Sequence, residues 1–342
     1  MVRPAPPELD ALRRPGSGAG QGVLMRTVLV TGGAGFIGSH VTGVLLERGL
    51  KVVCLDDFND YYDPAFKRAN VAPFAGHRDW QLVEGDIRDA HLVNDVYRNH
   101  GVEATIHLAA RAGVRPSIRD PRLYEEVNGL GTLNLLEAAH RWDAQLFVFG
   151  SSSSVYGINS KVPFAEDDPI TCPVSPYAAT KRANELTCYT YHHLYGLKIT
   201  CLRFFTVYGP RQRPEMAIYH FTERLARGGP VPRFGDGSTA RDYTYIDDIV
   251  AGVIAAFDAG HDFEIVNLGG SRTTTLARLI ELIAGELGVE PRIEMLPLQP
   301  GDVPITYADV AKAKRLWGWE PTVPIEEGIR RFVAWFREHR LR

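Results

Sequence analysis

The chain has few cysteines, no excess of one charge and no long hydrophobic run. Its four cysteines, Cys54, Cys172, Cys188 and Cys201, lie far apart in 342 residues, a spacing typical of neither a disulfide framework nor a metal site. A formal net charge of −3 gives no basic surface for a nucleic-acid backbone. No segment approaches the roughly 20 apolar residues that span a bilayer. We therefore expect a cytoplasmic protein that holds no metal and binds neither nucleic acid nor membrane.

What the sequence does contain is enough apolar residues, 45%, for one large or two moderate domains. Residues 1–24 are rich in Pro, Gly and Arg and are expected to form a disordered leader. In residues 25–205 short β-branched runs alternate with segments of helical periodicity, which predicts an α/β fold with a doubly wound parallel (Rossmann) sheet. Residues 206–342 are punctuated by Gly and Pro and predict mainly a smaller α/β lobe, some elements of which return to the first domain.

A glycine-rich turn, TGGAGFIG at residues 31–38, follows the first predicted strand and opens a helix. Gly32 allows a sharp turn, Gly35 lets the backbone approach a pyrophosphate, and Gly38 lets the helix pack on the sheet. Such a turn alone is also a common strand-to-helix connection. The next strand ends at Asp56, 18 residues after Gly38 (56 − 38), where a carboxylate binds the adenine ribose and repels a 2′-phosphate. Together the two features predict an NAD site, to which Asp86 belongs as an adenine ligand unless it is a helix N-cap.

Tyr177 and Lys181 are four residues apart and lie on one face of a predicted helix. A tyrosine packed beside a solvated lysine would give the same pattern. The pair follows four serines at the end of a predicted strand, residues 151–154, and ligands of α/β folds bind at this edge of the sheet. We expect Lys181 and a positive nicotinamide ring to lower the pKa of Tyr177 so that it transfers protons. The residues alone leave open which serine assists it.

From about Met25 to its C-terminus the chain resembles the extended short-chain dehydrogenase/reductases, and among them the NAD-dependent nucleotide-sugar epimerases. The resemblance is closest to the UDP-glucuronate 4-epimerases. The general motifs are the glycine-rich turn, HLAA at 107–110, the serine run and YAATK at 177–181. The narrower motifs are DFNDYYDP at 57–64 with Lys67 after it, AGVR at 112–115, RFFTVYGP at 203–210 and RPEMA at 213–217.

The resemblance implies the role of each residue in these motifs. Ser152, Tyr177 and Lys181 fall on the catalytic positions. The cofactor positions are Gly32, Gly35, Phe36, Ile37, Gly38, Asp56, Asn59, Lys67, Asp86, Ile87, Leu108, Ala109, Ala110, Tyr177 and Lys181. The substrate positions are Arg115, Ser153, Ser154, Thr206, Arg213, Met216, Arg241 and Asp302. Gln299 replaces an Arg of the UDP-galactose epimerases and removes one phosphate contact.

The implied reaction is the NAD-dependent conversion of UDP-glucuronate to UDP-galacturonate through a 4-keto sugar. Epimerisation of UDP-glucose or UDP-N-acetylhexosamine is the alternative. Dehydratases carry an Asp-Glu pair where this chain has Ser153 and Ser154, and decarboxylases carry a Glu at the position of Ser154, so both reactions are disfavoured. A non-enzymatic NAD-binding module would not need Tyr177 and Lys181.

The resemblance also implies a homodimer, in which helices near 123–141 and 177–195 of two chains pair as a four-helix bundle. The alternative is that the apolar faces of these helices pack only on their own sheet.

Overall fold

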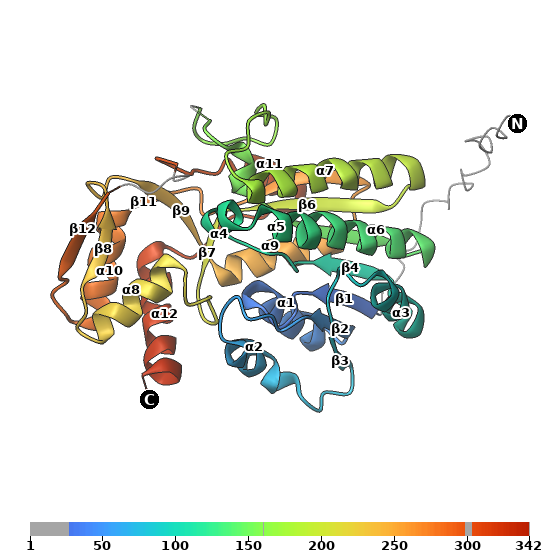
Figure 1. Ribbon diagram of the computed structural model, residues 1–342, viewed down its shortest axis with the longest axis horizontal. Coiled ribbons are helices and arrows are strands. Elements are labelled where there is room, and N and C mark those ends of the chain that lie inside the picture. Colours follow the sequence, from blue (N-terminus) through green and yellow to red (C-terminus); the bar gives the residue numbers. More distant parts are fainter. Residues whose placement is uncertain (1–26, 160, 298–302, 342) are drawn as a thin grey trace, which may run out of the picture.

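The structure is a computed structural model that describes residues 27–159, 161–297 and 303–341 (Figure 1). Three sequence predictions lie outside these residues: the disordered leader, the substrate ligand Asp302 and the replaced Gln299.

A seven-stranded sheet forms the centre of the larger lobe, and all of its strands are parallel. Its strands are β1 (Thr27–Thr31), β2 (Lys51–Asp56), β3 (Trp80–Glu84), β4 (Ala104–His107), β5 (Leu146–Ser152), β6 (Lys198–Phe204) and β10 (Phe263–Leu268). Their order across the sheet is β10-β6-β5-β4-β1-β2-β3. The order reverses direction between β1 and β4, and a crevice at such a point is where ligands of doubly wound sheets bind. The predicted α/β class is confirmed.

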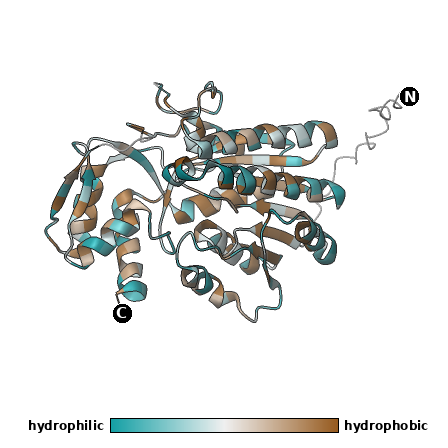
Figure 2. Ribbon diagram, in the orientation of Figure 1, coloured by the Kyte–Doolittle hydropathy of each residue, from teal (hydrophilic) through white to brown (hydrophobic). Residues whose placement is uncertain are grey.

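Helices cover both faces of this sheet (Figure 1). On one face lie α3 (Ala90–His100), α6 (Gly131–Arg141) and α7 (Pro176–Tyr195), which pack around Leu29, Val53 and Phe147. On the other lie α1 (Phe36–Glu47) and α9 (Ile246–Ala259), which pack around Val28 and Val30. The alternating residues of β1 thus point to opposite cores. Figure 2 shows the strands as mostly hydrophobic, as expected for a sheet buried on both faces.

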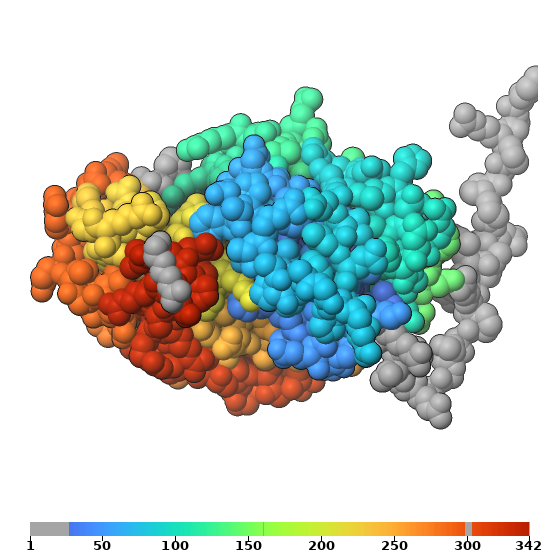
Figure 3. All heavy atoms as spheres, turned by 90° about the horizontal axis from the view of Figure 1, so that it is seen from below, coloured from blue at the N-terminus to red at the C-terminus, as the bar shows by residue number. Residues whose placement is uncertain are grey.

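The smaller lobe contains two short sheets and three helices. A parallel pair joins β8 (Val231–Phe234) to β12 (Ile293–Leu296), and a three-stranded sheet joins β7 (Thr206–Tyr208), β9 (Ala240–Tyr245) and β11 (Thr273–Thr275). The helices are α8 (Ala217–Ala226), α10 (Leu276–Leu287) and α12 (Ile325–Arg340). Their apolar faces join the core beneath α1 and α9, so one hydrophobic cluster runs through both lobes. Figure 3 shows the C-terminal segment lying directly against the N-terminal part of the chain.

The chain returns to the larger lobe after residue 206. Helix α9 packs against α1, β5 and β6, and β10 forms the edge of the large sheet beside β6. A short helix, α11 (Ala311–Trp317), packs on β10 and α9. The division at residue 205 therefore separates the lobes only in part.

The remaining helical elements lie in the connections between the strands. They are α2 (Pro64–Val71), η2 (Ala72–Phe74), α4 (Val114–Arg119), α5 (Pro121–Tyr124), the π-helical turn η3 (Glu125–Leu130) and the 3₁₀ turn η4 (Ser153–Tyr156). Several of these connections leave the carboxyl ends of the large-sheet strands, where the candidate site lies.

Candidate functional site

The glycine-rich turn joins β1 to α1 with little space for side chains. Gly32 has φ +66°, and a Cβ atom there would lie 2.8 Å from the backbone nitrogen of Ala109. A Cβ at Gly38 would collide with the carbonyl oxygen of Gly32. Gly35 is the N-cap of α1, so no side chain caps the start of this helix, and its first turn carries no acidic residue. The first N–H groups of α1 are therefore open to an anion.

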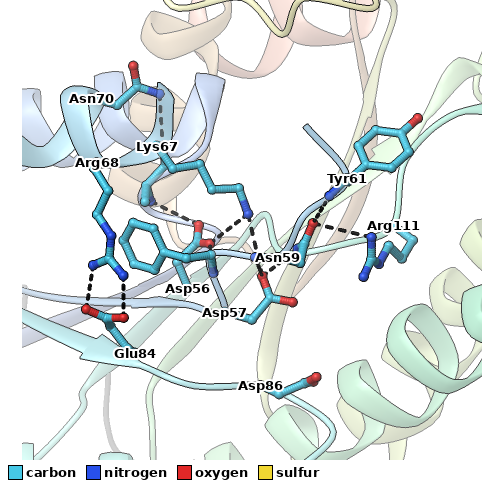
Figure 4. Close-up of polar contacts among 12 residues, drawn as sticks. Asp56, Asp57, Asn59, Tyr61, Lys67, Arg68, Asn70, Glu84, Asp86 and Arg111 are labelled. Carbon is cyan, nitrogen blue, oxygen red and sulfur yellow. Dashed lines mark hydrogen bonds and ion pairs between the residues drawn. The ribbon is translucent and has the colours of Figure 1, made fainter. Parts of the chain in front are cut away.

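Asp56, at the end of β2, is buried and accepts three hydrogen bonds (Figure 4). Its carboxylate accepts from the backbone N–H groups of Ala34 at 3.2 Å and Phe58 at 3.0 Å. Its third donor is Lys67 Nζ on α2, at 2.9 Å from Oδ1. Lys67 is also buried and lies 3.5 Å from Asp57. The Ala34 bond ties the end of β2 to the glycine-rich turn, and the ion pair ties α2 to the same carboxylate at the cavity wall.

Arg111 reaches Asn59, which lies beside Asp57 in the turn after β2 (Figure 4). Arg111 Nη1 donates to Asn59 Oδ1 at 3.3 Å, and its Nε is buried without a hydrogen-bond partner. Sequence reasoning missed Arg111, which directly follows the HLAA motif. An unsatisfied guanidinium donor in the cavity wall fits an anionic ligand such as a dinucleotide pyrophosphate.

Asp86 lies beyond β3 and also lines the groove. It is not the N-cap of α3, because Asp89 caps that helix by accepting from the N–H groups of His91 and Leu92. Asp86 instead accepts hydrogen bonds from the backbone and side chain of Arg88.

One cavity brings together almost all of the predicted cofactor positions. Its wall includes Gly32, Gly35, Phe36, Ile37, Asp56, Asn59, Lys67, Asp86, Ile87, Leu108, Ala109, Ala110, Tyr177 and Lys181. Gly38 does not line it, because it packs against the turn instead. The open helix N-terminus, the buried carboxylate and the unsatisfied Arg111 donor together fit a dinucleotide cofactor.

Helix α7 places Tyr177 and Lys181 in this cavity. The Ser175 hydroxyl caps the helix by accepting from the N–H of Ala178 at 3.1 Å, Pro176 occupies its first position, and Gly196 ends it in a left-handed conformation. Lys181 Nζ donates to the carbonyl oxygen of Gly150 at 2.7 Å. This bond holds α7 against the carboxyl end of β5.

The structure separates the serines of the run by the direction of their hydroxyl groups. Ser151 is buried, and its hydroxyl donates to Glu185 Oε1 at 2.6 Å. Ser152 Oγ accepts from both the N–H and the hydroxyl of Ser154, at 3.2 and 2.9 Å. Its own proton is then available for Tyr177, to which it is hydrogen-bonded. This geometry favours Ser152 as the serine that assists Tyr177, whereas Ser153 and Ser154 line the adjoining cavity.

The pKa of Tyr177 is not lowered in the protein alone. Burial raises the pKa of the phenol above its usual value, and only the Ser152 hydrogen bond and the positive charge of Arg213 oppose this effect. Burial also lowers the pKa of Lys181 to about 8. The sequence-based expectation that Lys181 activates Tyr177 is thus not met by the protein's own groups, since desolvation outweighs the attraction between charges.

Two buried asparagines, which sequence reasoning missed, connect α7 to the helices beside it. Asn128, in the π-helical turn η3, binds the backbone of Arg111 through its Oδ1 and Nδ2 atoms and donates to Thr180. Asn184 donates to the carbonyl of Asn128 and to Thr132. A π-helical turn widens the helix by one residue, and here it carries the side chain that links α7 to the cavity wall.

Four arginines line a second cavity, which adjoins the cofactor groove next to Tyr177 and extends into the smaller lobe. The cavity next to Tyr177 is lined by Arg115, Arg213 and Arg241, with Ser153, Ser154, Thr206 and Met216 around them. Arg119 lines it as well and was not predicted. A further cavity between β8, α8 and α10 shares Arg115, Thr206, Met216 and Arg241 with it. Tyr61, Arg213 and Met216 connect the first of these cavities to the cofactor groove.

Comparisons with known proteins agree with this arrangement. A family model described as GDP-mannose 4,6-dehydratase matches residues 29–332. A UDP-glucuronate 4-epimerase of Thermodesulfobacterium geofontis is 43% identical over 312 residues, which are 91% of this chain and 96% of that protein.

Two solved structures share the fold. One is the Bacillus cereus UDP-glucuronic acid 4-epimerase in complex with UDP-glucuronic acid and NAD, with TM-score 0.86, 34% identity and coverage of 91% of this chain and 99% of that one. The other is the Thermotoga maritima UDP-glucose 4-epimerase with UDP-glucose, with TM-score 0.84, 38% identity and coverage of 91% and 99%.

The fold and the groove at its switch point define a dinucleotide-binding enzyme of the doubly wound α/β class. Within that class the chain belongs to the extended short-chain dehydrogenase/reductase family. The predicted resemblance is confirmed. The roles of individual site residues stay predictions, although the structure brings the described ones together.

Proposed function

We propose that the protein converts UDP-glucuronate to UDP-galacturonate by NAD-dependent inversion at sugar carbon 4. Similarity to UDP-glucuronate 4-epimerases over 91% of the chain supports this reaction. NAD, when bound, supplies the hydride acceptor for carbon 4 and a positive ring that favours the charged form of Tyr177. Gly35, Asp56, Lys67 and Arg111 would hold it.

The observation that carries the proposal is the charge of the cavity beside Tyr177. Four arginines line it, at positions 115, 119, 213 and 241, and Glu215 is the single acidic residue among its described lining residues. UDP-glucuronate brings a diphosphate and a carboxylate into such a site. Guanidinium groups bind both anions through paired hydrogen bonds, so the cavity suits a substrate that carries a carboxylate as well as a diphosphate.

In the proposed cycle Tyr177 removes the proton from the hydroxyl at carbon 4 and later returns it. Ser152, whose hydroxyl accepts from Ser154 and lowers the pKa of Tyr177 through a hydrogen bond, would keep the sugar oxygen in reach during the transfer. A 4-keto uronate is a β-keto acid, which loses carbon dioxide when its carboxylate aligns with the carbonyl π system. Ser153, Ser154, Thr206 and Arg213 would hold the carboxylate out of that alignment.

The cavity beside Tyr177 does not support removal of water or of carbon dioxide. Dehydration at carbons 5 and 6 needs an acid and a base after the catalytic serine, and that position holds two hydroxyls, Ser153 and Ser154. Epimerisation of UDP-glucose is the stronger alternative, because the Thermotoga enzyme is 38% identical. The two substrates differ at sugar carbon 6, where UDP-glucuronate carries a carboxylate for Arg213 to bind and UDP-glucose carries a neutral group.

The experiment is to incubate the purified protein with UDP-glucuronate and, separately, with UDP-glucose, and to follow product stereochemistry and carbon dioxide release. We expect UDP-galacturonate with little gas, and slower or no formation of UDP-galactose. Faster turnover of UDP-glucose would replace the proposed substrate, and stoichiometric carbon dioxide would replace the proposed reaction.

We also propose that the protein is a cytoplasmic homodimer. The outer faces of η3, α6 and α7 expose Leu130, Leu133, Leu186, Tyr189 and Leu194, and two such faces could pair as a four-helix bundle. The four cysteines are free thiols, and three of them are buried, which suits a reducing compartment. No helix in the described residues is long and apolar enough to cross a membrane. Light scattering at micromolar concentration should give twice the chain mass; a monomer mass would contradict the dimer.

A further inference from the structure

Arg213 already has a carboxylate partner inside the cavity beside Tyr177. Its Nη1 atom lies 3.1 Å from Oε1 of Glu215, two residues further along the chain. Both side chains line this cavity, and Glu215 also lines the cavity between β8, α8 and α10. The group that would bind the carboxylate of the substrate is therefore engaged by a carboxylate of the protein.

We propose that Glu215 is an internal counter-ion, which occupies Arg213 in the free protein and is displaced from it by the carboxylate of a uronate substrate. The inference rests on the proposed function, and it assigns to Glu215 a role in the selectivity between acidic and neutral sugars. A neutral sugar cannot replace Glu215 on Arg213, whereas a glucuronate carboxylate can.

The surroundings make Glu215 the one candidate for this role. Among the described lining residues of the two cavities it is the sole acidic side chain, and it faces Arg115, Arg119, Arg213 and Arg241. Arg241 donates to the carbonyl oxygens of Ala240 and Pro304, so it is held by the backbone. Within the described residues Arg213 forms its ion pair with Glu215, and its guanidinium lies 5.8 Å from the centre of the Tyr61 ring.

The pair can exchange partners without a change in the backbone. The segment is anchored before Arg213 by buried Gln212, whose side chain donates to the carbonyl of Val207 at 3.0 Å. It is anchored after Arg213 by the N–H of Met216, which donates to the carbonyl of Arg213 at 3.2 Å. The side chains of Arg213 and Glu215 retain 22% and 39% exposure, and an ion pair this open to water contributes little net stability. Only side-chain rotation is then needed to release Glu215.

The test is the Glu215→Gln variant, which keeps the shape of the side chain and removes its charge. Binding of UDP-glucuronate and of UDP-glucose to the NAD-loaded protein is measured by calorimetry, and KM and kcat are measured for both sugars. We expect UDP-glucuronate to bind about two- to fivefold more tightly than it binds wild type, as expected for removal of a partly exposed competing ion pair. Binding of UDP-glucose should change by less than about twofold, which keeps the effect specific to the carboxylate.

Glu223→Gln is the matched control, because it removes an exposed ion pair with Arg227 on α8, outside both cavities. It should leave both affinities unchanged. If Glu215→Gln weakens UDP-glucuronate binding, Glu215 positions Arg213 and the proposal is overturned; equal affinity of variant and wild type overturns it as well. If wild type itself prefers UDP-glucose, the proposed function fails together with this inference.

Discussion

Replacing Tyr177 with phenylalanine is expected to lower kcat by a factor of about 10² to 10⁴, the usual contribution of a positioned acid-base group. The hydroxyl is the only group removed, and its hydrogen bond with Ser152, at the end of β5, lowers the pKa of Tyr177. Calorimetry should show that UDP-glucuronate binds with less than about a twofold change, because the nucleotide contacts lie in the other cavities. The measurement is single-turnover kinetics of sugar inversion alongside that titration.

Tyr189→Phe is the matched control on the same helix. Tyr189 is half exposed and lies two turns beyond Lys181, away from the cavity. Its turnover should equal that of wild type. If the Tyr177→Phe variant turned over as fast as wild type, Tyr177 would have no part in the mechanism. If the variant lost affinity for the sugar, Tyr177 would instead be a binding residue.

The second large effect concerns stability. Replacing Arg203 with leucine is expected to lower the free energy of unfolding by about 3–5 kcal/mol, because a charge loses its partner in the interior. Arg203, on β6, is 1% exposed, and its Nε and Nη2 atoms each lie 2.9 Å from an oxygen of Glu185 on α7. Burial raises the pKa of Glu185, but hydrogen bonds from Arg203 and Ser151 outweigh it and hold the net pKa below its usual value.

Urea unfolding followed by circular dichroism measures this loss. The control is Arg227→Leu, since Arg227 forms an exposed pair with Glu223 on α8, and its removal should change the free energy of unfolding by less than about 1 kcal/mol. A similar small change for Arg203→Leu would show that the Glu185–Arg203 pair does not hold α7 to the sheet.

Much of the fold could be predicted because its signals are local. The alternation of β-branched runs with helical segments in residues 25–205 predicted the doubly wound parallel sheet, and the turn at residues 31–38 and Asp56 marked the cofactor groove. What sequence periodicity could not give was the place of β10, which joins the large sheet from within the second half of the chain. The sequence of residues 263–268 does not show which sheet this strand joins, because strand pairing depends on contacts between residues distant in the chain.

The same limit applies to the site. Arg111 lies beside Asn59, and Asn128 beside Thr180, only after distant segments fold together. Glu185 follows Lys181 by four residues on one face of α7, but its partner Arg203 comes from β6, which the spacing along the helix does not reveal. Burial is a further property that a sequence does not display. It raises the pKa of Tyr177 in the protein alone, so the expected lowering depends on the nicotinamide ring as well as on Lys181.

The central claim of this account is that hydrogen leaves carbon 4 of the sugar and returns to it within one closed site, while Tyr177 moves only the hydroxyl proton. The most direct measurement uses UDP-glucuronate that carries deuterium at carbon 4, in ordinary water, with the product examined by mass spectrometry and proton NMR. The account predicts UDP-galacturonate that retains deuterium at carbon 4. Product with hydrogen from the solvent at that carbon would contradict it.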